Sequence, residues 1–435
     1  MGRGRGVRIL SADWVLPVES PPLENGAVAI GDDGRIVAVG SADELGEGER
    51  FTDAVILPGF VNAHSHLEYA VYTGFGDGLS FGPWIAVHVE RKQRIGIEEM
   101  EAIARLGALE CLRSGITTVG DASFAGAAAT ACDELGLRGI VYLEVFGRDE
   151  SALERFHEIR ARVTPALSDR VSLGVSPHAP YTCTLEVYRA CAELELPTIT
   201  HLAESEDETR YLLSGEGPWQ DFAELLVPPL RSTGIRGLAE AGLLGPHLVA
   251  AHCVQADAEE IALLAAHDVA VAHCPRSNAQ LGCGVAPLRD LLDAGVRVGI
   301  ATDSPASTPS FDMFDEMRAA LFAARAREQR PDALSAAEAL ELATLGGARA
   351  LRMDDEVGSL APGKQADLTV LSFAGSPLLP WEDPVTAVVL GGTPERVLAT
   401  LVSGTTRYER GSDTCHELSA AARHARARLL SRVSP

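Results

Sequence analysis

The chain has 435 residues, of which 46% are hydrophobic and 23% charged, a composition that excludes a disordered or fibrous protein. Its formal net charge of −24 repels phosphate backbones and anionic lipid surfaces, so neither nucleic acid nor a membrane surface is an expected partner. No stretch approaches the ~18 apolar residues of a membrane span, and the cysteines form no CxxC pair, so we expect a cytoplasmic protein with reduced thiols.

Both ends of the chain contain short runs that resemble hairpin strands. VRILSADWVLPV and GAVAIGDDGRIVAVG lie near the N-terminus, and QADLTVLSF and ATLVSGTTRYERG lie near the C-terminus, all punctuated by Gly or Asp. Neither end has enough strands to be stable alone. We therefore predict that residues 1–57 and 358–411 combine into one small β-sandwich domain.

Residues 58–357 alternate short β-branched runs with longer amphipathic stretches, which is the pattern of repeated βα units. The strand candidates are ILPGFVNAH, GITTVGD, GIVYLEVF, VSLGVSPH, PTITHLAE, HLVAAHCV, VAVAHCPRSN and RVGIATDS. Eight such units close a barrel more naturally than they extend an open sheet, so the expected fold class is α/β, a (β/α)₈ TIM barrel. Residues 412–435 are predicted to form a terminal helix outside the barrel.

Four candidate metal ligands occur at ends of these strands. In NAHSH, His64 and His66 are two residues apart, so both side chains leave one face of a strand and can reach one ion. By itself such a pair also fits a polar strand end facing solvent. His201 ends the fifth strand candidate and Asp303 the eighth, and barrel enzymes carry their chemistry at that end. We predict one divalent ion on these residues, Zn²⁺ before Fe²⁺ or Mn²⁺.

Three residues near this site are predicted to move protons. Glu204 lies three positions after His201, beside the water that an ion would activate, and it can pass a proton to a ring nitrogen of a substrate. The alternative for Glu204 is a charge that complements a helix dipole. Asp303 can accept a proton from water and deliver it to a leaving group. His252, at the sixth strand end, is assigned as a donor that orients the water, with a place among the ligands left open.

Four further residues are candidate substrate contacts. Trp84 in LSFGPWI can stack on a heteroaromatic ring or fill core space, and His178 in SPHAPYT can bond a substrate or support the fold. Glu68 and Arg148 are weaker candidates, because they can equally form an ion pair with each other at the barrel rim.

Other polar residues are expected to play smaller parts. His273, Ser277 and Asn278 in HCPRSN follow the seventh strand, where Ser and Asn more often brace a loop than touch substrate. The remaining histidines are predicted to lie at the surface: His88, His157, His247, His267, His416 and His424. No dinucleotide fingerprint, phosphate loop or nucleophile elbow is present, so no cofactor beyond the metal is expected.

PGFVNAHSHLEY, HLAES, AHCV, HCPRSN and TDSPAS together resemble the amidohydrolase superfamily, in its branch of chlorohydrolases and aminohydrolases that act on heterocycles. The resemblance spans nearly the whole chain, and GRIVAVG and GSLAPGKQADLTVL resemble the split sandwich domain of those enzymes. It implies a single metal ion and a small heterocyclic substrate. It also implies ligation by the four predicted residues, with Glu204 and His252 handling water. Because barrels of this kind often pair, we expect a homodimer.

Within that branch, HLEY, SFGPW and the HCPRSN, LGCG and APL run are most similar to aminofutalosine deaminases of menaquinone biosynthesis. Those enzymes convert a 6-aminopurine nucleoside derivative to its 6-oxo form and release ammonia. Deaminases of adenosine, S-adenosylhomocysteine or methylthioadenosine share the catalytic residues, although Leu67, Glu68 and Tyr69 replace a Met-containing motif of the homocysteine type. The resemblance implies deamination, with aminodeoxyfutalosine favoured. Dechlorination of a triazine, hydrolysis of a cyclic amide or guanidine, and a noncatalytic barrel protein are the alternatives.

Overall fold

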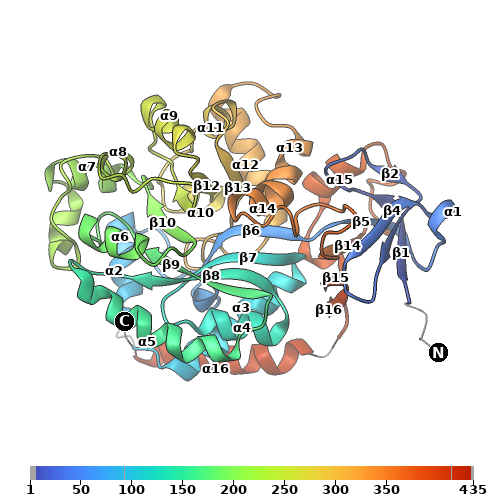
Figure 1. The fold of residues 1–435 in the computed structure, drawn as a ribbon, viewed down its shortest axis with the longest axis horizontal. Coiled ribbons are helices and arrows are strands. Elements are labelled where there is room, and N and C mark those ends of the chain that lie inside the picture. Colours follow the sequence, from blue (N-terminus) through green and yellow to red (C-terminus); the bar gives the residue numbers. More distant parts are fainter. Residues whose placement is uncertain (1–5, 93, 413, 433–435) are drawn as a thin grey trace.

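The computed structural model describes residues 6–92, 94–412 and 414–432 and shows a barrel beside a smaller sheet that carries the N-terminal strands (Figure 1). Within these residues, eight parallel strands pair in chain order. They are β6 (Phe60–Ser65), β7 (Ile116–Ser123), β8 (Arg138–Val145), β9 (Val171–Pro177), β10 (Thr198–Leu202), β11 (Leu248–His252), β12 (Ala270–His273) and β13 (Arg297–Ile300). Each lies within or overlaps one of the predicted runs, so the (β/α)₈ barrel is confirmed.

The barrel closes where its first and last strands meet, just beyond the end of β13. The backbone amide of Asp303 donates to the carbonyl of His64 at 3.0 Å, and Ser65 pairs with Asp303 in a parallel bridge. The Asn62 side chain bonds Thr302 twice, accepting from its amide at 2.9 Å and donating to its hydroxyl at 2.7 Å. Residues far apart in sequence are thus joined at the seam.

Helices alternate with the strands, and most of them cover the outside of the barrel (Figure 1). Those of the barrel region are α2 (Phe81–Lys92), α3 (Ile97–Arg113), α4 (Ala127–Leu135), α5 (Leu153–Val163), α6 (Leu185–Ala192), α7 (Glu206–Ser214), α8 (Gly234–Glu240), α9 (Ala258–Ala266), α10 (Pro275–Gln280), α11 (Leu288–Asp293), α12 (Met313–Glu328), α13 (Ala336–Glu341) and α14 (Gly347–Ala350). Most of their apolar sides pack on the strands through one large cluster of buried residues, while α2 and α7 contribute to a second cluster and α14 to a third. The last helix, α16 (Thr414–Arg432), places Ala422, Ala425 and Leu429 in a smaller cluster with Ile103 of α3.

Strands from both ends of the chain form one mixed sheet, in the order β16-β15-β14-β5-β1-β3-β4, with β2 paired to β1. Their bounds are β1 (Arg8–Val15), β2 (Leu23–Glu24), β3 (Gly26–Ile30), β4 (Ile36–Ser41), β5 (Glu49–Pro58), β14 (Leu368–Ser372), β15 (Val397–Val402) and β16 (Thr405–Glu409), and the short helices α1 (Ala42–Leu45) and α15 (Pro384–Gly391) lie between them in sequence. The returning strand β14 pairs antiparallel with β5, which leads directly into barrel strand β6. A buried ion pair also joins the two parts, since Arg138 of β8 donates to Asp367 beside β14 at 2.8 Å.

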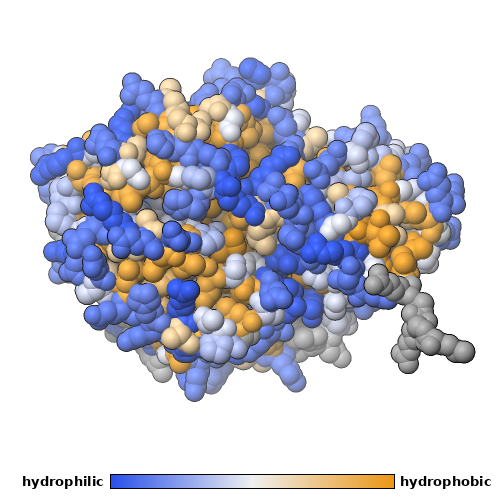
Figure 2. All heavy atoms as spheres, in the orientation of Figure 1, coloured by the Kyte–Doolittle hydropathy of each residue, from blue (hydrophilic) through white to orange (hydrophobic). Residues whose placement is uncertain are grey.

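The visible surface is mostly hydrophilic, with apolar side chains gathered over the barrel and over the mixed sheet formed by both ends of the chain (Figure 2). In the described part of the chain, no helix combines the length and the apolar character needed to cross a membrane.

Candidate metal centre and its pocket

The predicted metal ligands converge at one end of the barrel, because parallel strands present their carboxyl ends at the same rim. His64 and His66 come from the end of β6, His201 from β10, and Asp303 from the segment that follows β13. His252 is the last residue of β11 and, like Asp303, has a positive φ, 75° and 55° respectively. For residues other than glycine such backbone conformations are strained, and they occur preferentially at functional sites.

The potential ligand atoms lie within reach of a single ion. The Nε2 atoms of His66 and His201 are 3.3 Å apart, and Asp303 Oδ1 lies 3.7 Å from His64 Nε2 and 3.6 Å from His66 Nε2. The facing atoms of His64, His201 and His252 also lie within 4.8 Å of one another. None of these five side chains belongs to a residue more than 7% exposed, so little water reaches them.

The hydrogen bonds of the imidazoles show that this cluster fits a cation. His66 Nδ1 lies 2.9 Å from the carbonyl of Ala122, and His201 Nδ1 lies 2.8 Å from the carbonyl of His178. A carbonyl can only accept, so both Nδ1 atoms carry the proton and both Nε2 atoms direct lone pairs at each other. Neither nitrogen of buried His64 has a hydrogen-bond partner among the described residues. A divalent cation satisfies all of these lone pairs.

Electrostatics keep the imidazoles in the form that binds metal. Burial, followed by the charges of neighbouring imidazoles, holds the pKa of His64 and of His66 well below the usual range. Neutral imidazole is the ligand form. Asp303 is oriented by Ser277 and Ser307, whose hydroxyls donate to Oδ2 at 2.5 Å and 3.0 Å, which leaves Oδ1 toward the histidines. Ser277 therefore supports a predicted ligand.

Glu204 and His252 face each other beside the cluster. Glu204 Oε2 lies 3.7 Å from His252 Nε2, which leaves the two groups close without a direct hydrogen bond. His252 Nδ1 donates to Asn278 Oδ1 at 3.0 Å, and burial lowers the pKa of His252 to about 4, so Nε2 is an acceptor. Burial, and then the charge of Asp303, raise the pKa of Glu204 well above its usual range. This pair suits proton exchange through a small molecule held between its members.

The loop that carries Glu204 is held by a second carboxylate. Glu208 of α7 accepts from the amides of Ala203 and Glu204 at 3.0 Å and 2.7 Å, and Ser205 caps the same helix. Ala203 has a positive φ of 53°, so these bonds also stabilise a strained backbone. Sequence reasoning missed Glu208, although an acidic residue shortly after a strand-end motif and a Ser cap was a usable signal.

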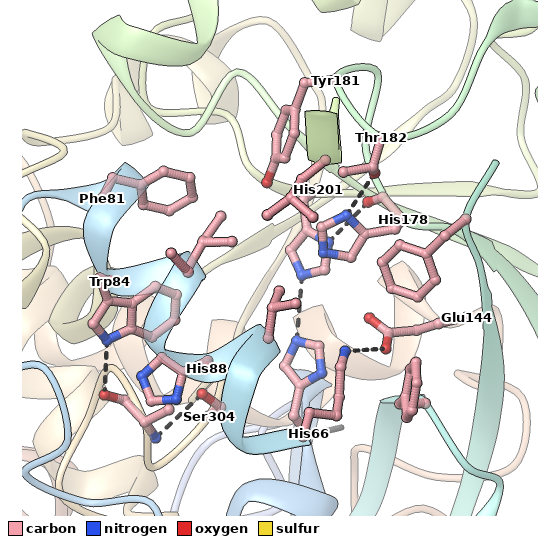
Figure 3. Close-up of a pocket in the computed structure, with 18 of the residues that line it drawn as sticks. His66, Phe81, Trp84, His88, Glu144, His178, Tyr181, Thr182, His201 and Ser304 are labelled. Atoms are coloured by element: carbon pink, nitrogen blue, oxygen red, sulfur yellow. Dashed lines mark hydrogen bonds and ion pairs between the residues drawn. The ribbon is translucent and has the colours of Figure 1, made fainter. Parts of the chain in front are cut away.

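A cavity of about 370 Å³ opens above the cluster. His66, His201, Glu204, His252 and Asp303 form part of its lining. Aromatic side chains such as Phe81, Trp84 and Tyr181 form much of the rest (Figure 3). The aromatic lining residues are Tyr69, Phe81, Trp84, Phe124, Phe146, Tyr181 and Trp219. The cavity is large enough for a heterocyclic small molecule and presents flat apolar surfaces to it.

Two of the candidate substrate contacts line this cavity. Trp84 does so and donates its Nε1 proton to the carbonyl of Ala306 at 3.3 Å, while His178 lines the cavity with Nδ1 2.8 Å from the Thr182 hydroxyl. Glu68 and Arg148 are not among the described lining residues.

The alternative for Glu68 and Arg148, an ion pair with each other, is wrong. Glu68 accepts from Ser123 and from three backbone amides at the start of α4, whereas Arg148 donates to the carbonyl of Leu226 at 2.9 Å. Both side chains are therefore engaged with loops, and neither faces the cavity.

The surface assignment of His88 is also wrong. His88 is 6% exposed and lines the cavity, with its ring centroid 4.4 Å from that of Trp84, because α2 lies over the cavity rather than on the outside of the barrel. Burial lowers the pKa of His88 to about 3. The side chains predicted at the surface and found exposed are His157, His247, His267 and His424, while that of His416 lies outside the described residues.

Three charged lining residues were not predicted: Lys92, Glu144 and Arg155 of α5. Lys92 ends α2 and Glu144 lies near the end of β8, and both border the cavity. A glutamate within the apolar run VYLEVF was the signal that sequence reasoning overlooked, since a carboxylate in a buried strand needs a partner.

Known proteins resemble this chain along most of its length. A 5-methylthioadenosine/S-adenosylhomocysteine deaminase from Moorella thermoacetica is 34% identical over 412 residues, which cover 91% of this chain and 93% of that protein. A 5'-deoxyadenosine deaminase from Methanothermobacter thermautotrophicus is 34% identical over 376 residues, covering 83% and 84%. An adenosine deaminase from Xanthomonas campestris, solved with bound zinc, superimposes with a TM-score of 0.86 at 30% identity, covering 97% of this chain and 98% of that one. The amidohydrolase family matches residues 55–407, which include the barrel strands and the whole histidine and aspartate cluster, and this chain therefore belongs to that family.

Proposed function

We propose that this protein is a metal-dependent deaminase that hydrolyses the 6-amino group of an adenine nucleoside to the 6-oxo product and ammonia. The observation that carries the proposal is the buried Glu204–His252 pair beside a cluster of neutral imidazoles and a carboxylate, at the floor of an aromatic-walled cavity. Relatives named for deamination of methylthioadenosine, S-adenosylhomocysteine, 5'-deoxyadenosine and adenosine support the same reaction class.

His64, His66, His201 and Asp303 are proposed to hold one divalent ion, with Zn²⁺ favoured by the ligand set and by the zinc bound in a similar deaminase. When bound, such an ion lowers the pKa of water to about 7 and so makes hydroxide available at neutral pH.

Proton transfer is assigned to residues whose positions suit it. Glu204, whose pKa is raised by burial, donates a proton to the ring nitrogen next to carbon 6, which makes that carbon electrophilic. His252 Nε2 accepts a hydrogen bond from water and orients it, so it acts as an acceptor and not as the donor suggested by sequence. Asp303 takes one proton of the attacking water and passes it to the departing ammonia. The remaining hydroxyl proton returns to Glu204 as the 6-oxo group forms.

The substrate is proposed to be a nucleoside derivative whose base stacks against the aromatic wall. The motifs in the sequence favour aminodeoxyfutalosine, and the named relatives favour methylthioadenosine, S-adenosylhomocysteine and 5'-deoxyadenosine. All of these share the adenine ring on which the proposed chemistry acts.

Ammonia release from zinc-loaded protein tests the proposal. Aminodeoxyfutalosine, 5'-deoxyadenosine, methylthioadenosine, S-adenosylhomocysteine and adenosine are supplied in parallel, with a chlorinated triazine and chloride detection as the alternative. We expect ammonia from at least one nucleoside and a loss of about 10²–10⁴-fold in kcat for Glu204→Gln at unchanged metal content. Glu206→Gln is the matched control, because Glu206 is only two residues away but exposed. Ammonia from none of the nucleosides refutes the proposal.

A further inference from the structure

One side of the cavity carries a charged pair that the proposed chemistry does not use. Lys92 Nζ lies 3.8 Å from Glu144 Oε2, and the two side chains are 12% and 2% exposed. This separation exceeds that of a hydrogen bond. Figure 3 labels Glu144 at the cavity. Within the described chain, no hydrogen-bond donor reaches Glu144 Oε2, although the atom is buried. A buried carboxylate oxygen that lacks a hydrogen bond is costly, and here it borders a cavity.

Aromatic rings surround the ammonium group of this pair. Lys92 Nζ lies 4.0 Å from the ring centroid of Phe124, 5.1 Å from that of Phe146 and 5.8 Å from that of Tyr69. The rings stabilise the cation through their faces but accept no conventional hydrogen bond. Its three N–H donors therefore retain capacity for a partner within the cavity.

A series of neighbouring rings connects the metal cluster with this pair along the cavity. The His201 and His178 rings are 4.7 Å apart, the His178 and Phe146 rings are 4.7 Å apart, and Lys92 follows at 5.1 Å from Phe146. A base that lies along His178 and Phe146 can therefore present its sugar to Lys92, since all three residues line the cavity.

Charge balance identifies the kind of group that this pair can bind. A carboxylate on the ligand cannot donate a hydrogen bond to Glu144 Oε2, and an ammonium meets the charges of Lys92 and of Arg155, which lines the same cavity, so both are disfavoured. A hydroxyl donates to Glu144 and accepts from Lys92 without adding charge. We propose that Lys92 and Glu144 form a subsite that binds the vicinal hydroxyls of the sugar, an inference that rests on the proposed nucleoside deaminase function.

Binding of a pair of 6-oxo nucleosides tests this subsite without turnover. Inosine and 2',3'-dideoxyinosine differ only in the two hydroxyls, and their dissociation constants are measured by calorimetry on zinc-loaded protein. We expect the wild type to bind inosine at least about tenfold more tightly, as charged hydrogen bonds imply. Lys92→Met and Glu144→Gln should each reduce that preference, and the double variant should bind the two ligands within about twofold of each other.

The double variant also guards against misfolding, since it removes both charges and leaves no unpaired ion buried. Lys364→Met and Glu19→Gln are matched controls, because Lys364 is the only other lysine of the sequence and pairs with Glu19 at 3.2 Å outside the cavity. These controls should keep the full preference for inosine.

The two proposals fail separately in these experiments. Equal binding of both ligands by the wild type, or a preference that the double variant retains, overturns the subsite even when ammonia is released from a nucleoside. A wild type that prefers inosine through Lys92 and Glu144 but releases no ammonia from any 6-aminopurine nucleoside keeps the subsite and overturns the deaminase.

Discussion

Replacing Glu68 separates a capping role from a substrate contact. Its carboxylate accepts from the Ser123 hydroxyl at 2.6 Å and from the amides of Phe124, Ala125 and Ala127 at 2.9 Å, 3.0 Å and 2.9 Å. Glu68→Ala leaves three backbone donors without this acceptor at the start of α4. At about 1–3 kcal/mol for each unsatisfied buried donor, with water replacing part of the loss, we expect destabilisation of roughly 3–6 kcal/mol.

The assay is urea unfolding followed by tryptophan fluorescence, combined with steady-state kinetics of the protein that remains folded. Glu68→Ala should shift the unfolding midpoint to lower urea, and Glu68→Gln should do so by less, because it retains one acceptor oxygen. The KM of both variants should stay within about twofold of wild type, since the side chain does not line the cavity. Glu98→Ala, which removes an exposed acid from the first turn of α3, is the control. An unchanged midpoint with a KM raised tenfold or more refutes the capping role.

Three further outcomes are expected. Chelation of the metal should abolish ammonia release and lower the thermal midpoint, because the lone pairs of His66 and His201 then face each other at 3.3 Å. Zinc at a thousandfold excess over its Kd should restore about 4 kcal/mol of unfolding free energy. Calorimetry that finds equal midpoints with and without metal contradicts this prediction. Glu208→Gln should lower kcat at least about tenfold with zinc content unchanged, because one amide of the loop that carries Glu204 loses its acceptor. Steady-state kinetics and metal analysis of the same sample check this prediction. Burial raises the pKa of Glu316 to about 7 from 4.5, so the folded state holds this proton more tightly than the unfolded chain, and the resulting stability is complete below pH 4.5 and lost as pH rises through 7. Glu316→Gln should therefore flatten the fall in unfolding free energy between pH 4.5 and 7 by up to roughly 3 kcal/mol, and an unchanged slope in urea titrations argues against it.

Sequence reasoning located the barrel strands and the convergence of the candidate ligands because both follow from local periodicity. An apolar run that ends in His201 or Asp303 places that side chain at the rim wherever the run lies in the chain. The partners of Glu68 could not be found in this way, since they are backbone amides of a loop more than 50 positions later. His88 was misplaced for a related reason: its helix is amphipathic in sequence, but the side that holds His88 faces a cavity formed by other segments.

The seam between β6 and β13 has a consequence for how the apoprotein opens. Asn62 and Thr302 are 240 positions apart, and the amide of Asp303 donates to His64, one proposed ligand to another. An ion bound at these proposed ligands would therefore link the first barrel strand to the segment after the last, across the longest loop that barrel formation has to close. In the metal-free protein, the amide of Asp303 should exchange with deuterium before the amides of interior strands such as β10. Loss of metal would then cause local unfolding of the barrel to begin at this edge.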